Sequence, residues 1–132
     1  MLRKCSAQTL IELKKGEFTM DCLFCSIVKG DIPSTKVYED ETVYAFKDIN
    51  PMAPVHVLII PKVHISSIND VTAENSAVIA HIYEVAAKLA KELGIDESGF
   101  RVVSNCGADA GQTVFHLHFH LLGGTKLKVE MC

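Results

Sequence analysis

Residues 115–122 read FHLHFHLL, and this stretch decides the fold of the chain. Histidines occupy every second position, at 116, 118 and 120, and apolar residues fill the positions between them. Side chains in a β-strand alternate between its two faces. The spacing therefore predicts a strand whose two faces differ, one for a core and one for chemistry. The imidazoles lie on one face and Phe115, Leu117, Phe119 and Leu121 on the other.

A shared metal ion is one reason for such a row of imidazoles, but strand geometry argues against it. At about 3.3 Å per residue, His116 and His120 lie roughly 13 Å apart, whereas Zn–N bonds measure only about 2.0 to 2.1 Å. At most two neighbouring rings can bind one ion, which leaves at least one histidine for other work. Three unrelated histidines are the remaining alternative, but a strand gains no stability from three rings that each need hydrogen-bond partners.

A glycine-bearing turn leads directly into the histidine row. Residues 107–114 read GADAGQTV, and a turn of this kind presents backbone N–H groups that can hold phosphate oxygens. Alone, the segment is more typical of an ordinary loop. Joined to Gln112, Thr113 and the imidazoles, it indicates a phosphate site.

These motifs resemble those of the histidine triad family. The family signature is His-φ-His-φ-His-φ-φ, where φ is apolar, and residues 116–122 match it without exception. Other stretches similar to the family are residues 46–51 (FKDINP), 53–56 (APVH) and 60–62 (IPK), and the resemblance runs from about residue 22 to residue 127. Gly123 and Gly124 favour the Hint-like branch, which hydrolyses nucleoside phosphoramidates, over the Fhit-like dinucleoside polyphosphate hydrolases.

The resemblance implies a covalent mechanism. A neutral imidazole is a competent nucleophile near neutral pH, and His118 would attack the α-phosphorus of a purine nucleotide conjugate to give a nucleotidyl-imidazole that water hydrolyses. The other implied catalytic residues are His120 at the α-phosphate, His56 as a support, and Thr113 and Gln112 near the leaving group. The implied substrate-binding residues are Asp48 for the ribose, Asn105 and Gly111 for the phosphate, and Phe24, Ile27, Ile49 and Leu58 around the purine. A plain core role stays open for these last four.

A C-x-x-C pair, Cys22 and Cys25, is the second signal. Taken alone it could be a redox pair, a metal half-site or chance. Two thiolates with two imidazoles suit tetrahedral Zn²⁺ in a closed, structural site. Resemblance to bacterial family members implies that His64 and His116 complete such a zinc site. Cys5, Cys106 and Cys132 have no spacing partner and are interpreted as reduced thiols.

Composition narrows the class of protein. The chain has 132 residues, 48% of them hydrophobic and 22% charged, with a net charge of −3. This charge gives no basic field for nucleic acid, and no apolar run approaches the 18 or so residues that span a bilayer. Five cysteines are an odd number and no signal peptide is recognisable. We therefore expect a cytoplasmic protein with neither nucleic acid nor membrane as a partner.

The pattern along the chain predicts an α+β, HIT-like fold: an antiparallel sheet of about five strands with one long and one short helix. The expected short helix covers residues 24–29 and the long helix residues 72–93. The expected strands cover residues 36–39, 42–48, 55–60, 100–105 and 115–122.

Residues 20–132 are interpreted as a single HIT domain. Residues 1–19 are interpreted as an N-terminal extension that is disordered or not native, with Met20 as the natural start. By resemblance, the long helix and a strand edge would join two subunits in a homodimer. A zinc-stabilised module that binds nucleotides without turnover is the alternative to an enzyme, although such a binder gains little from an aligned nucleophile.

Overall fold

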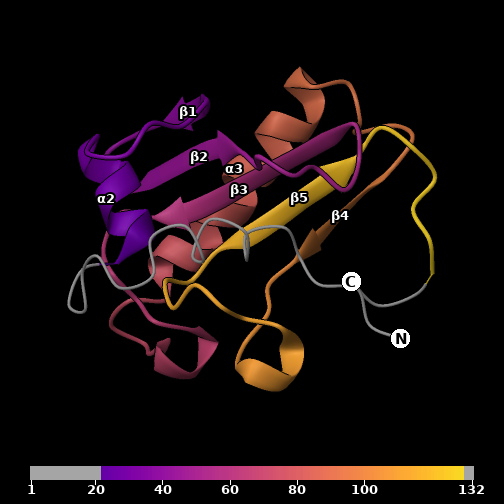
Figure 1. Ribbon diagram of the computed structural model, residues 1–132. Helices are drawn as coiled ribbons and strands as arrows, with labels where there is room; N and C mark the ends of the chain where they lie inside the picture. The colour runs from indigo at the N-terminus through magenta and orange to yellow at the C-terminus, as the bar shows by residue number, and fades with distance from the viewer. Residues whose placement is uncertain (1–21, 130–132) are drawn as a thin grey trace.

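The structure is a computed structural model that describes residues 22–129 of the chain. Within these residues, five antiparallel strands form one sheet in the order β1-β2-β3-β5-β4 (Figure 1). The strands are β1 (Lys36–Glu39), β2 (Val43–Lys47), β3 (Val55–Pro61), β4 (Phe100–Val103) and β5 (Phe119–Gly123). A short helix, α2 (Leu23–Lys29), and a long helix, α3 (Ala77–Glu92), complete the predicted α+β fold. The extension expected at residues 1–19 lies outside the described residues.

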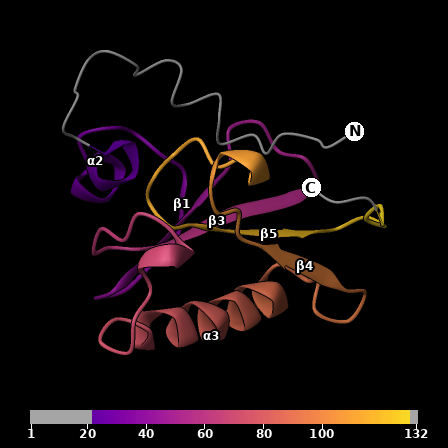
Figure 2. The same cartoon turned by 90° about the horizontal axis from the view of Figure 1, so that it is seen from below.

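The two helices cover opposite faces of the sheet (Figure 2). Each face therefore has its own core of buried apolar side chains. The α3-side core consists of Val43, Ala45, Val57, Ile59, Ile65, Ile82, Val85, Ala86, Leu89, Ala90, Ile95, Leu117, Phe119 and Leu121. The α2-side core is smaller and consists of Leu23, Phe24, Ile27, Tyr44, Phe46, Leu58, Ile60 and Val114.

Strand alternation assigns the polar side chains of the central strands to the α2 side. In β3, Ile59 belongs to the α3-side core and Leu58 to the α2-side core. His56 lies two residues before Leu58 and so shares its face. In β5, Phe119 faces α3, which directs His120 to the same side as His56. The face of the sheet that α2 covers therefore also carries the imidazoles of His56 and His120.

The histidine row is not a continuous strand, contrary to the sequence prediction. β5 begins at Phe119, so His116 and His118 lie in the irregular segment before it. The alternation of faces persists, because Leu117 packs in the α3-side core while His116 and His118 contact the ring of Phe24. The prediction fails for Phe115, whose exposed fraction is 52%. The segment leaves the ladder here because Leu117 N–H donates to Ile65 O, at 2.6 Å, and not to a neighbouring strand.

The long helix begins five residues later than predicted. Thr72 N–H donates to Asn75 Oδ1 at 2.7 Å, and Asn75 N–H donates to Thr72 O at 3.1 Å. The first bond, from the backbone to the Asn75 side chain, competes with helix formation, and the second closes a turn before Ala77. The helix ends as predicted before Gly94, which has a φ of 74°. No helix in residues 22–129 has the length and apolar character needed to cross a membrane.

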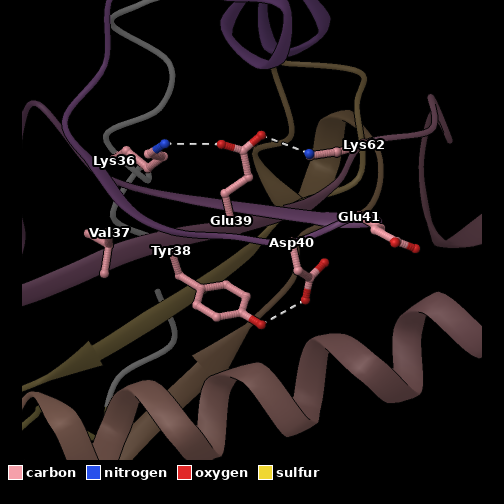
Figure 3. Close-up of a pocket in the computed structure, with 7 residues that line it drawn as sticks. All are labelled: Lys36, Val37, Tyr38, Glu39, Asp40, Glu41 and Lys62. Atoms are coloured by element: carbon pink, nitrogen blue, oxygen red, sulfur yellow. Dashed lines mark hydrogen bonds and ion pairs between the residues drawn. The ribbon is translucent and has the colours of Figure 1, made fainter.

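His81 of α3 ties the helix to the turn between β1 and β2. Its Nε2 lies 2.6 Å from Asp40 Oδ2, and its Nδ1 lies 3.0 Å from Glu84 Oε1. The Tyr38 hydroxyl donates to Asp40 Oδ2 at 2.8 Å, and Figure 3 shows the two side chains pointing toward each other. The hydrogen bond to Glu84 and then that to Asp40 raise the pKa of His81. The charged imidazolium therefore fits this position best.

This ion pair predicts a pH-dependent contribution to stability. A histidine whose pKa is raised on folding stabilises fully below its unfolded pKa of about 6.5 and loses that contribution as pH rises through the folded pKa. We expect the difference in unfolding free energy between wild type and His81→Ala to shrink over that range. Because the pair is partly exposed and screened by solvent, the difference should be about 0.2–1 kcal/mol. Urea unfolding at a series of pH values measures it.

A double-mutant cycle of His81→Ala with Asp40→Ala serves as the control. It should give a coupling energy at pH 6 that declines at alkaline pH. A His81→Ala difference that is the same at all pH values would contradict the assignment of His81 as an imidazolium.

Candidate functional site

The predicted site residues come from elements far apart in the sequence and meet on the α2 side of the sheet. α2 brings Cys22 and Cys25, the end of β3 brings His64, and the segment entering β5 brings His116. Next to them lies a second group formed by His56, His118 and His120. The two groups share the segment 116–120, so they are parts of one site.

The thiol and imidazole groups of the first set converge. Cys22 Sγ lies 3.3 Å from His116 Nδ1, and Cys25 Sγ lies 3.5 Å from both His116 Nδ1 and His64 Nδ1. All four ligand atoms lie within 4.8 Å of one another. A tetrahedral centre with Zn–S bonds of about 2.3 Å and Zn–N bonds of about 2.0 to 2.1 Å places sulfur and nitrogen about 3.6 Å apart. These four residues could therefore bind a metal ion.

The orientation of His116 supports a role as a ligand. Its Nε2 lies 2.8 Å from Pro61 O, and only a protonated nitrogen can donate to a carbonyl. Nδ1 is then left with its lone pair, which faces the two sulfur atoms. A backbone carbonyl that fixes the second nitrogen of a ligating histidine is a common feature of metal sites. Burial lowers the pKa of His116 to about 4, so the ring is neutral.

His118 is also neutral and oriented. Its Nδ1–H donates to His116 O at 2.8 Å, so its Nε2 carries the lone pair. The ring is 4% exposed and packs edge-on against Phe24, with centroids 5.1 Å apart. Burial lowers the pKa of His118. The arrangement leaves Nε2 able to act as a nucleophile.

His56 and His120 form a directed chain of hydrogen bonds. Met52 N–H donates to His56 Nδ1 at 3.0 Å, which requires the proton of that neutral ring to sit on Nε2. His56 Nε2–H then donates to His120 Nδ1 at 2.9 Å, and the proton of His120 sits on Nε2. His120 Nε2 is buried without a hydrogen-bond partner. A buried N–H in this state can donate to an anionic ligand.

The same bonds exclude a second metal centre. Ligand atoms of Asp48, His56 and His120 also lie within 4.8 Å of one another. A metal among them would need a lone pair on His56 Nε2, but Met52 N–H already takes the other lone pair of the ring. Binding would then require an imidazolate. Burial lowers the pKa of His56 and holds that of His120 at about 3, so both rings are neutral donors and acceptors.

The residues implied in substrate binding differ in how deeply they are buried. Asp48 follows β2 and is 5% exposed, with Oδ1 accepting from Asn50 N–H at 2.9 Å. Its Oδ2 is buried, lacks a hydrogen-bond partner and lies 3.5 Å from His56 Nε2. Phe24, Ile27 and Leu58 belong to the α2-side core, whereas Ile49 is 54% exposed. The structure thus groups three of the four apolar residues and leaves Ile49 at the surface.

Gln112 is fully engaged with the backbone. Its Oε1 accepts from Gly107 N–H at 2.9 Å, and its Nε2 donates to Ser66 O at 2.9 Å and to Val114 O at 3.2 Å. Both amide protons are used. The side chain therefore spans the turn that contains the 3-10 helix η2 (Ala108–Ala110) and ties it to Ser66.

The remaining predicted residues border that turn. Gly111 ends it with a φ of 89°, a conformation that favours glycine. Thr113 and Asn105 are both half-buried, and Asn105 follows Ser104, whose hydroxyl donates to His118 O at 3.0 Å. The Ser104 side chain thus links the segment that precedes the turn to the backbone of His118.

A surface pocket elsewhere holds none of the predicted site residues (Figure 3). It lies along the edge strand β1 and is lined by Lys36, Val37, Tyr38, Glu39, Asp40, Glu41 and Lys62. Both of its lysines pair with Glu39, at 3.1 and 2.7 Å. With Asp40 and Glu41 the lining carries three carboxylates against two lysines, so the pocket makes a weak candidate for an anionic ligand.

Sequence reasoning missed the backbone partners of the imidazoles. Pro61 O and Met52 N–H fix the protons of His116 and His56, and no residue type encodes a backbone group. Nor did it find the pairing of His81 with the carboxylates of Asp40 and Glu84. The position of His81 three residues before Glu84 was the available signal.

Known proteins match most of the chain in sequence. The family model described as HIT domain matches residues 29–127. A purine nucleoside phosphoramidase of Escherichia coli (strain K12) is 46% identical over 107 residues, which cover 81% of this chain and 90% of that protein.

Solved structures extend the agreement to the fold. A HIT family hydrolase from Legionella pneumophila is 50% identical, covers 83% of this chain and 97% of its own, and has a TM-score of 0.81. A histidine triad protein from Clostridium difficile is 52% identical, with coverages of 86% and 98% and a TM-score of 0.82. The five-stranded antiparallel sheet is therefore the HIT fold.

The four-ligand cluster predicts that Cys22→Ser weakens metal binding and lowers stability. Metal binding contributes to folding free energy, and a metal at 100 times its dissociation constant stabilises by about 2.7 kcal/mol. We expect Cys22→Ser to lose a contribution of this size. Metal analysis of the purified protein and denaturant unfolding measure the two effects.

Cys106→Ser is the matched control, because Cys106 is half-buried and outside the cluster. It should keep the metal and the stability of wild type. Purified wild type without metal, with both thiols of the C-x-x-C pair rapidly alkylated, would rule the metal site out.

The contacts of Gln112 predict a structural cost for Gln112→Glu. The carboxylate can still accept from Gly107 N–H but cannot donate to Ser66 O or Val114 O, which leaves buried carbonyls unpaired. Such losses cost about 1–3 kcal/mol. Denaturant unfolding measures the change. Asp109→Asn, an exposed change in the same turn, should have little effect, and equal stability of the two variants would contradict the assignment.

Proposed function

The chain belongs to the HIT family, and we propose that it is a nucleotide hydrolase that cleaves purine nucleoside 5′-phosphoramidates or related conjugates at the α-phosphorus. One observation carries the proposal: His118 is a buried, neutral imidazole whose Nδ1–H is held by His116 O, which leaves Nε2 as a nucleophile. The similarity to a purine nucleoside phosphoramidase favours the phosphoramidate class.

The first chemical step forms a bond between His118 Nε2 and the α-phosphorus. The P–N bond of the substrate breaks, and the amine leaves with its electron pair and takes a proton from solvent. Phosphorylation makes the imidazole cationic. The carbonyl of His116, 2.8 Å from Nδ1, stabilises that positive charge.

The second step releases the nucleoside monophosphate. Water attacks the phosphorus, loses a proton to solvent, and the P–Nε2 bond breaks to restore neutral His118. In both steps negative charge collects on the phosphate oxygens. We assign His120 Nε2–H as a donor to that charge, because it is buried and unpaired while His56 fixes its tautomer.

Substrate binding would use groups around the same face. Asp48 Oδ2 is the proposed acceptor for the ribose hydroxyls, since it is buried and without a hydrogen-bond partner. Phe24, Ile27, Ile49 and Leu58 remain the proposed surroundings of the purine. Asn105, Gly111 and Thr113 border the phosphate turn, whereas we now assign Gln112 to positioning that turn because both its amide protons are engaged.

We propose Zn²⁺ as the ion of the four-ligand cluster. Cys22, Cys25, His64 and His116 supply two sulfur and two nitrogen donors, the set typical of closed structural zinc sites. When bound, the ion would supply a cross-link and no open coordination position. His118, the next imidazole along the segment, stays available for chemistry.

Two further proposals concern assembly and compartment. A homodimer is supported by the edge strand β4, where Phe100 is 39% exposed, and by Tyr83 of α3, which is 53% exposed. Edge strands with exposed apolar side chains favour pairing with another chain. A cytoplasmic location is supported by the four-ligand cluster, because its two cysteines must be reduced to bind a metal ion.

The decisive test is release of AMP from adenosine 5′-phosphoramidate. We expect wild type to release AMP, and His118→Ala to lose turnover by at least about 10³-fold because the nucleophile is gone. Binding of AMP to His118→Ala should persist, since Asp48 and the apolar surroundings are unchanged. Intact-mass measurement without acid should detect a nucleotidyl adduct on wild type only.

His120→Ala is the matched comparison, because it removes a donor and leaves the nucleophile. It should keep measurable turnover. Near-normal turnover by His118→Ala would disprove the covalent mechanism. Faster hydrolysis of diadenosine polyphosphates than of the phosphoramidate would favour the Fhit-like alternative, and binding without any turnover would favour the interaction module.

A further inference from the structure

His116 directly connects the four-ligand cluster to the proposed nucleophile. His116 Nδ1 faces both thiols of the cluster, at 3.3 and 3.5 Å. The carbonyl oxygen of the same residue accepts the hydrogen bond from His118 Nδ1 at 2.8 Å. Any shift of His116 therefore moves the acceptor that orients the nucleophile.

Residues 64–66 make a second connection. His64 Nδ1 lies 3.5 Å from Cys25 Sγ. The next residue, Ile65, accepts from Leu117 N–H at 2.6 Å, and Ser66 O accepts from Gln112 Nε2 at 2.9 Å. Three consecutive residues thus contact the metal cluster, the backbone beside the nucleophile, and the phosphate turn.

α2 makes a third connection. Cys22 and Cys25 bracket Phe24, whose ring packs against the rings of both His116 and His118, at centroid distances of 6.0 and 5.1 Å. Cys22 also caps the helix by accepting from Cys25 N–H at 3.4 Å. The position of the helix that supports the nucleophile therefore depends on the two thiols.

Neither connecting segment is a strand of the sheet. Residues 62–66 follow β3 and residues 115–118 precede β5, both without regular structure. Each segment is anchored in the α3-side core by one residue, Ile65 (5% exposed) and Leu117 (1% exposed), whereas His64 and Val63 are exposed. A metal bound to His64 and His116 would cross-link the two segments and α2 at one point.

We propose that the metal at Cys22, Cys25, His64 and His116 positions the nucleophile His118, so that metal occupancy controls the rate of nucleotidyl transfer in a protein that stays folded. The inference rests on the proposed function and adds a regulatory role to the metal cluster. The metal ligands act here as positioning residues. Because a misplacement of about 1 Å can cost about 100-fold in rate, a small shift of His116 is sufficient.

The test uses the full chain with His64→Ala, a change at an exposed ligand that leaves the buried ligand His116 in place. We expect this variant to bind Zn²⁺ weakly and to remain folded by circular dichroism without it. As Zn²⁺ is added, kcat should rise at least about 10-fold in proportion to occupancy. The dissociation constant for AMP should change less than about threefold, because Asp48 lies on another segment.

Two readouts do not depend on turnover. Absorption of Co²⁺ bound to thiolate reports occupancy. Nitrogen chemical shifts of the His118 ring report whether Nδ1 keeps its proton and its acceptor, and these should differ between the metal-free and metal-loaded variant. His81→Ala is the matched control: it removes a histidine outside the cluster, so chelator and Zn²⁺ should affect it as they affect wild type.

Equal kcat and equal His118 shifts in the folded protein with and without metal would overturn the proposal. If the metal-free variant unfolds, exchange of Zn²⁺ for Cd²⁺ in wild type decides, because the larger ion lengthens the ligand bonds while the chain stays folded. Unchanged kcat and shifts on exchange would then overturn the proposal. Failure of the proposed function is distinct: fully loaded wild type would release no AMP at all.

Discussion

A neutral imidazole carries one proton on two nitrogens, and in this protein the backbone decides which nitrogen holds it. Pro61 O accepts a hydrogen bond from His116 Nε2–H, which leaves the lone pair of Nδ1 facing the thiols. The carbonyl of His116 accepts from His118 Nδ1–H and leaves the lone pair on Nε2, the proposed nucleophile. Met52 N–H makes His56 a donor toward His120. Four chemically identical side chains thereby acquire different roles.

Burial makes this assignment possible. His116, His118 and His120 are each at most 4% exposed, and the loss of solvent lowers the pKa of all three. A protonated ring would have two donors and no lone pair. His116 could then not bind a metal, His118 could not act as the proposed nucleophile, and His120 could not accept from His56. His81 on the opposite face shows the contrast, because its two carboxylate partners raise its pKa. The same residue type is thus a neutral site group on one face and a charged structural group on the other.

The sheet separates stability from chemistry. The larger core lies under α3 and contains the apolar side chains of the segment that leads into β5, such as Leu117 and Phe119. The smaller core under α2 contacts the imidazoles directly through Phe24. α2 has only 7 residues and is capped by the Cys22 thiol, so the short helix that packs against the imidazoles begins at one of the two thiols.

The sequence was sufficient for the α+β class and for the family, because alternation and the spacing of the histidines are local properties of the chain; the division of the triad into a ligand and a nucleophile was implied by the resemblance and stays a proposal. It located α2, β1 and the end of α3 well, since Gly30 and Gly94 mark helix ends locally. It misjudged the start of β5 and the side of Phe115, because Leu117 pairs with Ile65, 52 positions earlier in the chain. Only the tertiary structure brought His64 to Cys25, engaged both amide protons of Gln112 and fixed the tautomer of each histidine. These features depend on backbone groups from distant segments, and no pattern of side chains along the sequence records where a carbonyl will point.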